Sequence, residues 1–349
     1  VTFSISLLKP GEHELRLNAL GDNIGDALVR QAVVVPDGEK ETEAFSGKFT
    51  GEVHQTISIA EDAIEGGNRV EVMLTPGISS QVVSGTDALL KEPSGCFEQT
   101  TSTAWPNTIV TQYLKTTGQL TPELEAKAFG LVLRGYQRLM TFESPTGGIN
   151  WWGNGCTDPG NRILTAIMLW HLKDMEGIIE TDEAFRDRLL TWLLEQQDND
   201  GSFDAGDALH AGNEVLGTSV ARTTSFIAWA LAHTGWADDA ASRAVNWLET
   251  HLPEGTDLYA NALALNAVAK VAPASSAAAT LLTRIDASKA QAAAGLKWPT
   301  ATASWTGASG DAADLETTGL VAYGLIQADA YPENAEGALK GLFDSHGLA

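Results

Sequence analysis

The stretch Thr165-Ala-Ile-Met-Leu-Trp-His-Leu172 recurs along the chain as Thr224-Ser-Phe-Ile-Ala-Trp-Ala-Leu231 and as Thr318-Gly-Leu-Val-Ala-Tyr-Gly-Leu325. Each copy is apolar at the three- and four-residue spacing of a helix and follows a loop rich in glycine or aromatic residues. A more polar, amphipathic helix is predicted after each copy. Hairpins that repeat an apolar and an amphipathic helix favour two concentric layers. We therefore expect an α/α toroid of about six helical hairpins, with an open solenoid as the alternative.

The apolar copies are expected to form the inner ring of this toroid. Their aromatic residues Trp170, Trp229 and Tyr323 should then be largely buried, whereas the amphipathic partners should lie outside. The clearest helices are predicted at Glu123–Phe142, Arg162–Met175, Glu183–Gln196, Val220–His233 and Glu316–Ala328.

Residues 1 to about 76 follow a different period. Apolar and polar residues alternate there, and the breaks between the runs contain glycine. The alternating apolar residues are Phe3, Ile5, Leu7, Leu15, Leu17, Ile57, Ile59, Val70, Val72 and Leu74. All ten Trp lie beyond the change of pattern near Thr75-Pro76-Gly77. The predicted fold class is therefore α+β and multidomain, with N-terminal antiparallel β-sandwich segments before the toroid.

The amino-acid composition limits the classes of molecule that the protein can bind. With 44% hydrophobic residues among 349, the chain can bury a large core. Twenty-two Lys and Arg against 45 Asp and Glu give a net charge of −23, which argues against nucleic acid and anionic membranes as partners. The sequence contains no apolar run long enough for a transmembrane helix. The chain starts directly in a strand pattern without a signal peptide, so we expect a processed or excised piece.

The side chains that can react with each other lie in the segment Pro93-Ser94-Gly95-Cys96-Phe97-Glu98-Gln99-Thr100. A thiol and a carboxamide three residues apart lie on one face of a helical turn and can touch. The Cys96 sulfur can then attack the Gln99 carbonyl carbon, expel ammonia and close a thioester. A helix that starts here would stabilise the thiolate when it leaves.

This segment resembles the thioester motif of the α2-macroglobulin and complement C3 family, as does the following Pro106-Asn107. Phe97 stands where animal members most often have glycine. The resemblance implies the end of a macroglobulin-like β-domain at residues 1–40, part of a CUB-like domain at 41–76 and a toroidal thioester domain at 77–349. It also implies a secreted protein, extracellular or periplasmic and of bacterial type.

By the same resemblance, the protein captures target proteases or cell-surface hydroxyl groups in a single covalent acyl transfer. It is then not an enzyme, and it needs no metal and no small-molecule cofactor.

His210 follows a segment, from Leu194 to Phe203, that is similar to the complement segment carrying the catalytic histidine. The resemblance implies that His210 attacks the thioester first and gives an acyl-imidazole. The Cys96 thiolate would then act as the base for an incoming hydroxyl. We expect His171, His233 and His251 to be surface or lining residues without a chemical role.

Other interpretations remain open from the sequence. Cys156 is an inert loop thiol, a disulfide partner of Cys96 or a crosslink to another chain. Glu98 caps or pairs locally, with no chemical step assigned to it. The toroid could also be a binding module without a live thioester. An isoprenoid-cyclase type of enzyme is a further alternative, although the sequence contains neither an Asp-x-Asp-Asp motif nor an evident zinc-binding set.

Overall fold

The chain divides into two compact units, residues 1–75 and 76–348, which are described separately below. The structure is a computed structural model. It describes residues 4–6, 9–39, 41–43, 45, 51–64, 67–72, 74, 90–153, 155–205, 219–293, 295–304 and 307–345. Several residues named in the sequence interpretation lie outside the described residues: Phe3, Leu7, Thr75, Pro76, Gly77 and His210.

The first unit contains one antiparallel hairpin, formed by β1 (Gly11–Leu20) and β2 (Gly25–Val34). Its strands pair from Gly11 opposite Val34 to Leu20 opposite Gly25, and Gly21 N donates to Ile24 O at 2.7 Å to close the turn. The opposed Leu17 and Leu28 remain 50% and 49% exposed. The hairpin therefore has the alternation expected for a strand face, but the described residues place no second sheet over it.

A β-sandwich is not seen in the described part of residues 1–75. Ile57, Ile59, Val70 and Val72 belong to no strand and are exposed. Alternation states only which residues could share a face, and a sandwich forms when a second sheet covers that face. The macroglobulin-like and CUB-like assignments of residues 1–40 and 41–76 therefore stay predictions.

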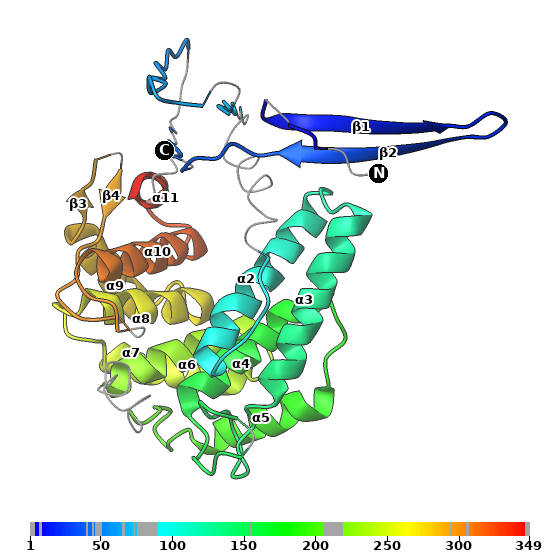
Figure 1. The fold of residues 1–349 in the computed structure, drawn as a ribbon. Coiled ribbons are helices and arrows are strands. Elements are labelled where there is room, and N and C mark those ends of the chain that lie inside the picture. Colours follow the sequence, from blue (N-terminus) through cyan, green and yellow to red (C-terminus); the bar gives the residue numbers. More distant parts are fainter. Residues whose placement is uncertain are drawn as a thin grey trace. The chain divides into compact units, whose positions relative to one another are not determined.

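The second unit is built from five helical hairpins, counted over its described residues (Figure 1). The first members are α2 (Phe97–Thr116), α4 (Arg162–Met175), α6 (Val220–Thr234), α8 (Leu258–Val271) and α10 (Asp311–Gln327). The second members are α3 (Pro122–Met140), α5 (Glu183–Glu195), α7 (Asp238–Thr250), α9 (Ser276–Ala287) and α11 (Pro332–Ser345). A two-residue pair of strands, β3 (Ala290–Gln291) and β4 (Leu296–Lys297), lies between α9 and α10. Helix bounds predicted from periodicity agree to within a few residues, except that α10 begins earlier than expected.

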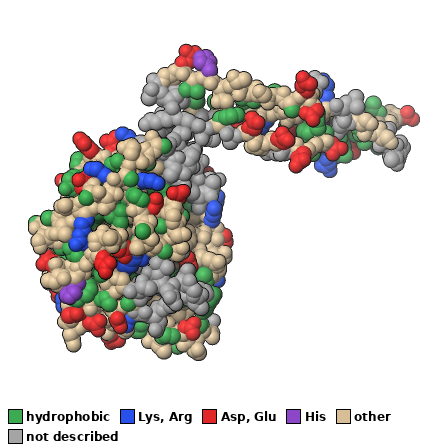
Figure 2. Space-filling view, turned by 90° about the vertical axis from the view of Figure 1, so that its left-hand side faces the viewer, with side chains coloured by type: hydrophobic (Ala, Val, Ile, Leu, Met, Phe, Trp, Pro, Cys, Tyr) green, Lys and Arg blue, Asp and Glu red, His purple; other side chains and the backbone are tan. Residues whose placement is uncertain are grey.

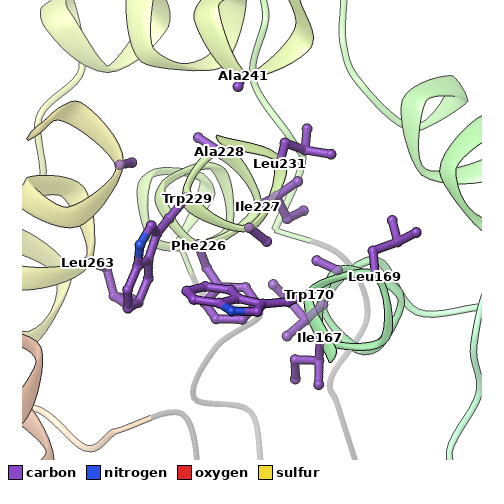
Figure 3. Packing of buried hydrophobic residues seen from close by; sticks show 14 of the residues in the cluster. Ile167, Leu169, Trp170, Phe226, Ile227, Ala228, Trp229, Leu231, Ala241 and Leu263 are labelled. Carbon is purple, nitrogen blue, oxygen red and sulfur yellow. The ribbon is translucent and has the colours of Figure 1, made fainter. Parts of the chain in front are cut away.

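The helices form two layers, as the repeat predicts. Almost every residue of α8 is buried, and α4 and α6 are buried along most of their length. The helices α5, α7 and α9 bury one face each, for example Phe185, Leu189 and Leu193 of α5. In the core Trp170 of α4 meets Phe226 and Trp229 of α6 (Figure 3). Apolar helices inside and amphipathic helices outside are thus observed directly.

The inner helices pack in the order α2, α4, α6, α8, α10. Among the described residues, α10 and α2 share at most a marginal contact, so these five helices do not close a ring by themselves. The prediction for Trp170 and Trp229 is confirmed, since each is 7% exposed, but the prediction for Tyr323 is wrong. Tyr323 is 47% exposed because α8 is the one inner helix on which α10 packs extensively in the described part of the chain. The centroid of its ring lies 5.5 Å from that of Trp229.

A threonine of an inner helix fixes the loop before that helix; it lies near the helix start in α4 and α6 and midway along α10. The Thr165 hydroxyl accepts a hydrogen bond from Ile149 N at 2.9 Å, and the Thr224 hydroxyl accepts one from Phe203 N at 2.9 Å. Thr318 does the same for Trp298 N at 3.0 Å. The three threonines are fully buried, as are the three loop residues. These threonines open the three sequence repeats, which explains why the repeat begins with this residue type.

A carboxylate on α4 joins three inner helices. Asp174 accepts from the Trp105 indole N–H of α2 at 2.7 Å and lies 2.7 Å from His233 Nε2 of α6. His171, expected to be a surface or lining residue, lies one turn earlier and is fully buried. Its Nε2 bonds the Thr108 hydroxyl at 3.0 Å, and burial lowers the pKa of His171 to about 3. A neutral imidazole is therefore part of the core.

Chain reversal in each hairpin brings the starts of the inner helices to one end of the unit. At this end Arg222 of α6 forms a two-pronged ion pair with Asp257, the residue before α8, at 2.8 and 2.9 Å. Arg222 also donates to Ala303 O, and Thr302 donates to Asp257, so the loop before α10 joins them. Burial raises the pKa of Asp257, but hydrogen bonds from Arg222, Ala260 N and Thr302 together with the Arg222 charge outweigh it, so the pKa lies below its usual value.

The surface of the helical unit carries both signs of charge. Figure 2 shows Asp and Glu side chains spread over the face in view, with Lys and Arg among them. In the described part of the chain, no helix combines the length and the apolar character that crossing a membrane requires.

Replacing Thr224 by Val tests the loop anchor. Valine keeps the volume but removes the acceptor, so the buried Phe203 N–H loses its partner. We expect the free energy of unfolding to fall by about 1–3 kcal/mol, measured by denaturant titration of tryptophan fluorescence. The control is Thr280→Val on the exposed face of α9, whose hydroxyl bonds only Ser276 O of its own helix. The control should change stability by about 0.5 kcal/mol or less; equal losses in the two variants would contradict the anchor.

Candidate functional site

Cys96 and Gln99 meet at the start of α2. Cys96 is the N-cap residue, with an extended backbone at φ −71° and ψ −179°, and Gln99 is the third residue of the helix. The Gln99 side chain folds back, and its carbonyl oxygen accepts a hydrogen bond from Cys96 N at 3.2 Å. This is the geometry of a capping box, in which the residue at the third position reaches back to the N-cap backbone. The carboxamide is thereby held against the residue that carries the thiol.

Gly95 leaves the space that this folded side chain needs. Its φ is +90°, a conformation that L side chains rarely adopt. A Cβ at this position would lie 2.0 Å from Gln99 Oε1 and 2.9 Å from Gln99 Cδ. Any side chain at residue 95 would therefore drive the carboxamide away from Cys96.

Arg138 of α3 fixes this turn through hydrogen bonds. Its Nε donates to the Thr100 hydroxyl at 3.1 Å, and its Nη2 donates to Gly95 O. Thr100 in turn lies 3.3 Å from Ser94 O and from Gly95 O. Sequence reasoning missed Arg138, because an arginine in the last turn of a helix is ordinary and nothing in the pattern pairs it with residue 95.

The loop before α4 contacts the start of α2. Phe97 N donates to Trp151 O at 3.0 Å. The Phe97 side chain is 1% exposed and packs edge-on against Phe142, with 5.7 Å between ring centroids. The bulky residue between Cys96 and Gln99 therefore points into the core and does not line the site.

A cavity of about 570 Å³ opens over the Cys96–Gln99 pair. Its lining residues are Gly95, Cys96, Glu98, Gln99, Ser102 and Trp152. Cys96 and Glu98 are partly buried, whereas Gln99 and Ser102 are exposed. Sequence reasoning did not find Trp152 or Ser102. The glycine- and aromatic-rich loop was seen as part of the repeat, but its contact with α2 is a tertiary one that the sequence pattern does not reveal.

Cys156 is a free, partly buried thiol that does not line this cavity, and Cys96 is also free of any disulfide. A hydrogen bond from the Asp158 backbone lowers the pKa of Cys156, but the Asp158 carboxylate and burial outweigh it, so the pKa is raised overall. A raised pKa leaves less thiolate at neutral pH. Of the three predicted site residues, the structure brings Cys96 and Gln99 together, and His210 lies outside the described residues.

No group of three His, Cys, Asp or Glu side chains that could hold a metal ion occurs within the described ranges. The site is thus composed of a thiol, a carboxamide, a carboxylate, a hydroxyl and an indole. These groups can support acyl transfer between sulfur, oxygen and nitrogen nucleophiles.

Known proteins are similar to this chain in sequence. The model of the A-macroglobulin TED domain matches residues 69–336. The chain is 29% identical over 218 residues to thioester-containing protein 1 allele R1 of Anopheles gambiae, and 28% identical over 215 residues to allele S3. These matches cover 60% and 58% of this chain but only 16% of each relative. The family model covers most of the chain and all the residues of the Cys96–Gln99 site, and the chain belongs to the thioester-domain family of the macroglobulins and complement proteins.

Proposed function

We propose that Cys96 and Gln99 form an internal thioester through which the protein attaches itself covalently to target nucleophiles. The observation that carries this proposal is the folded Gln99 side chain, whose carbonyl oxygen lies 3.2 Å from Cys96 N in the space left by Gly95. The cavity over the pair supplies the space in which an acceptor can approach.

The chemistry has two steps. In the first, the Cys96 sulfur attacks Gln99 Cδ, a C–S bond forms, the C–Nε2 bond breaks, and ammonia leaves with the thiol proton. In the second, an acceptor oxygen or nitrogen attacks the same carbon, the C–S bond breaks, and the Cys96 thiolate takes the acceptor proton. The start of α2 stabilises this thiolate, because unpaired backbone N–H groups point at the N-terminal end of a helix.

His210 is proposed as the first nucleophile for hydroxyl acceptors. Support comes from the described residues on either side of its segment. Asp204 O accepts from Arg162 at the start of α4, and Ser219 caps α6 through a bond from Arg222 N. Both ends of the segment thus belong to the end of the unit at which α2 begins. Attack by imidazole would give an acyl-imidazole and free the thiolate to act as a base.

The wider assignment rests on family membership. Since the chain spans about a sixth of the length of the relatives it matches, activities of a whole protein need segments beyond this one. We propose a protein of bacterial type, extracellular or periplasmic, that captures proteases or tags cell-surface hydroxyl groups. Residues 1–40 and 41–76 would be its macroglobulin-like and CUB-like parts, and residues 77–349 its thioester domain.

Intact mass tests the bond. Freshly prepared protein should weigh one ammonia less than its sequence, and methylamine should add one equivalent at Gln99. Cys96→Ala should abolish both effects, because no sulfur remains to activate the carbonyl. A full sequence mass together with a titratable Cys96 thiol in untreated protein, and no methylamine adduct, would favour a toroid that only binds.

Gly95→Ala tests the need for space beside Gln99. The new Cβ would overlap Gln99 Oε1, so we expect the ammonia loss and the methylamine adduct to disappear while the helical fold is retained. Gly155→Ala is the matched control, because Gly155 has nearly the same φ, +89°, and nothing lies within 4 Å of its Cβ position. Both variants carry a backbone penalty of about 1–2 kcal/mol. If the two variants kept equal thioester yield, crowding at residue 95 would not matter.

His210→Asn tests the acceptor preference. We expect slower transfer to glycerol and slower hydrolysis, by about 10²- to 10⁴-fold, with the reaction toward methylamine nearly unchanged because small amines attack the thioester directly. The measurement is the ratio of glycerol adduct to methylamine adduct in one preparation. An unchanged ratio would show that His210 takes no part.

A further inference from the structure

We infer that the backbone N–H of Cys96 is the oxyanion donor of the acyl transfer, and that Arg138 is the positioning residue that aims this N–H. In this role the N–H stabilises the negative charge that develops on Gln99 Oε1 each time a nucleophile adds to Gln99 Cδ. The inference rests on the proposed thioester and assigns the stabilisation of its tetrahedral intermediates to named groups of this chain.

The peptide group between Gly95 and Cys96 is bound on both sides. Its carbonyl oxygen, Gly95 O, accepts a hydrogen bond from Arg138 Nη2 and lies 3.3 Å from the Thr100 hydroxyl. Its N–H, that of Cys96, donates to Gln99 Oε1 at 3.2 Å. The C=O and N–H of a planar trans peptide point in opposite directions. Because Arg138 and Thr100 hold the oxygen, the N–H is aimed at the carboxamide.

Both steps of the proposed reaction place charge on the atom that this N–H contacts. In closure, the Cys96 sulfur adds to Gln99 Cδ and the electrons of the C=O bond move to Oε1. The C–N bond then breaks, and ammonia leaves with the thiol proton. In transfer, the acceptor adds to the same carbon, charge again develops on Oε1, and the C–S bond breaks to give a thiolate that takes the acceptor proton. A preorganised donor at this oxygen lowers both barriers.

The length of the hydrogen bond fits a role in the transition state. At 3.2 Å, the contact between Cys96 N and Gln99 Oε1 is longer than the usual N–H···O distance of about 2.9–3.0 Å. A bond to a charged oxygen is shorter and stronger than one to a neutral carbonyl. The interaction can therefore strengthen as the oxygen becomes negative, and only such a differential interaction accelerates a chemical step.

Arg138 makes the N–H a stronger donor in addition to aiming it. The guanidinium carries a full positive charge at neutral pH, and its bond to Gly95 O polarises the peptide group, since hydrogen bonds in a chain strengthen one another. The side chain is exposed but fixed, because its Nε also donates to the Thr100 hydroxyl at 3.1 Å. Its guanidinium carbon lies 5.7 Å from the centroid of the Phe142 ring.

A second arginine of the same helix offers a matched control. Arg134 lies one turn before Arg138 on α3 and forms a two-pronged ion pair with Glu92, at 2.7 and 2.9 Å. It ties down the same segment of chain before α2, but its hydrogen bonds go to a carboxylate and not to the peptide group between residues 95 and 96. A difference between variants of the two arginines therefore reports on that peptide group and not on the loss of a cation.

The first test measures the rate of acyl transfer. Pseudo-first-order rate constants for incorporation of excess methylamine are followed by intact mass, so they do not depend on the fraction of protein that carries the thioester. We expect Arg138→Met to slow incorporation about three- to thirtyfold, which is part of the roughly 10²- to 10³-fold that loss of an oxyanion donor costs. Arg138→Lys keeps the charge but not the fork and should give an intermediate rate. Arg134→Met should react at the wild-type rate.

The second test observes the N–H itself. The chain has two cysteines, so protein labelled with ¹⁵N-cysteine gives two amide resonances. The Cys156 N–H, which donates to a backbone carbonyl at 3.0 Å, is the internal reference. A weaker hydrogen bond moves an amide proton upfield, so Arg138→Met should move the Cys96 resonance and leave that of Cys156 in place. Spectra are recorded after methylamine treatment, because residue 99 then carries a carboxamide oxygen that accepts the same bond in every protein.

Three results would overturn the inference. They are a wild-type rate for Arg138→Met, an equal loss of rate in Arg134→Met, and a loss of rate in Arg138→Met without movement of the Cys96 resonance. If Arg138→Met folds but does not close the thioester, the resonance decides: an upfield shift supports the donor, and an unmoved resonance contradicts it. If Arg138→Met does not fold, Arg138→Lys is judged by the same two measurements.

The wild-type protein distinguishes these failures from failure of the proposed function. Incorporation of methylamine by the wild type reports that the thioester exists, whatever the variants do. Wild type that reacts, together with an Arg138→Met variant that behaves like it, contradicts the oxyanion donor alone. Wild type that incorporates no methylamine contradicts the thioester, and the inference falls with it.

Discussion

The hydrogen bond from a loop N–H to a threonine hydroxyl of an inner helix is the constraint on which the helical unit depends. Ile149, Phe203 and Trp298 are fully buried, and each brings a backbone N–H into the core that a regular helix or sheet does not satisfy. A buried N–H without an acceptor costs about 1–3 kcal/mol. Because threonine provides the acceptor, each of these three loops is held against the helix that follows it. The hairpins then stack with their loops at a common end.

The same device builds the reactive end of the molecule. Thr165 fixes Ile149, and three residues later the chain reaches Trp152 at the cavity over Gln99. Between them, Trp151 O takes the N–H of Phe97, which is one of the four orphan donors at the start of α2. The core of α4 and the first turn of α2 are therefore coupled through one short loop. A substitution at Thr165, which is distant from Cys96 in the sequence, would therefore alter the site through the loop that contains Ile149 and Trp152.

The inner repeat, the helix positions and the Cys96–Gln99 pair could be read from the sequence because each depends on residues near one another in the chain. Arg138 and Trp152 could not, since their roles come from contacts between helices and loops distant in sequence. Tyr323 was predicted to be buried from its likeness to Trp170, but burial depends on a neighbour along the flank of α10 that the repeat does not specify. The alternation in residues 1–75 describes one strand face and not what covers it, so the β-sandwich stays a prediction.

The first turn of α2 shows how one helix can serve both stability and chemistry. Side chains at positions 97, 100, 101 and 104 point inward and are buried, whereas those at 98, 99 and 102 line the cavity. A helix advances 3.6 residues per turn, so these two sets necessarily lie on opposite sides. Cys96, as the N-cap, sits at the boundary between them and is only partly buried. A large side chain at residue 97 therefore adds to the core through Phe142 without crowding the acyl group, and the space beside Gln99 is controlled by Gly95 instead.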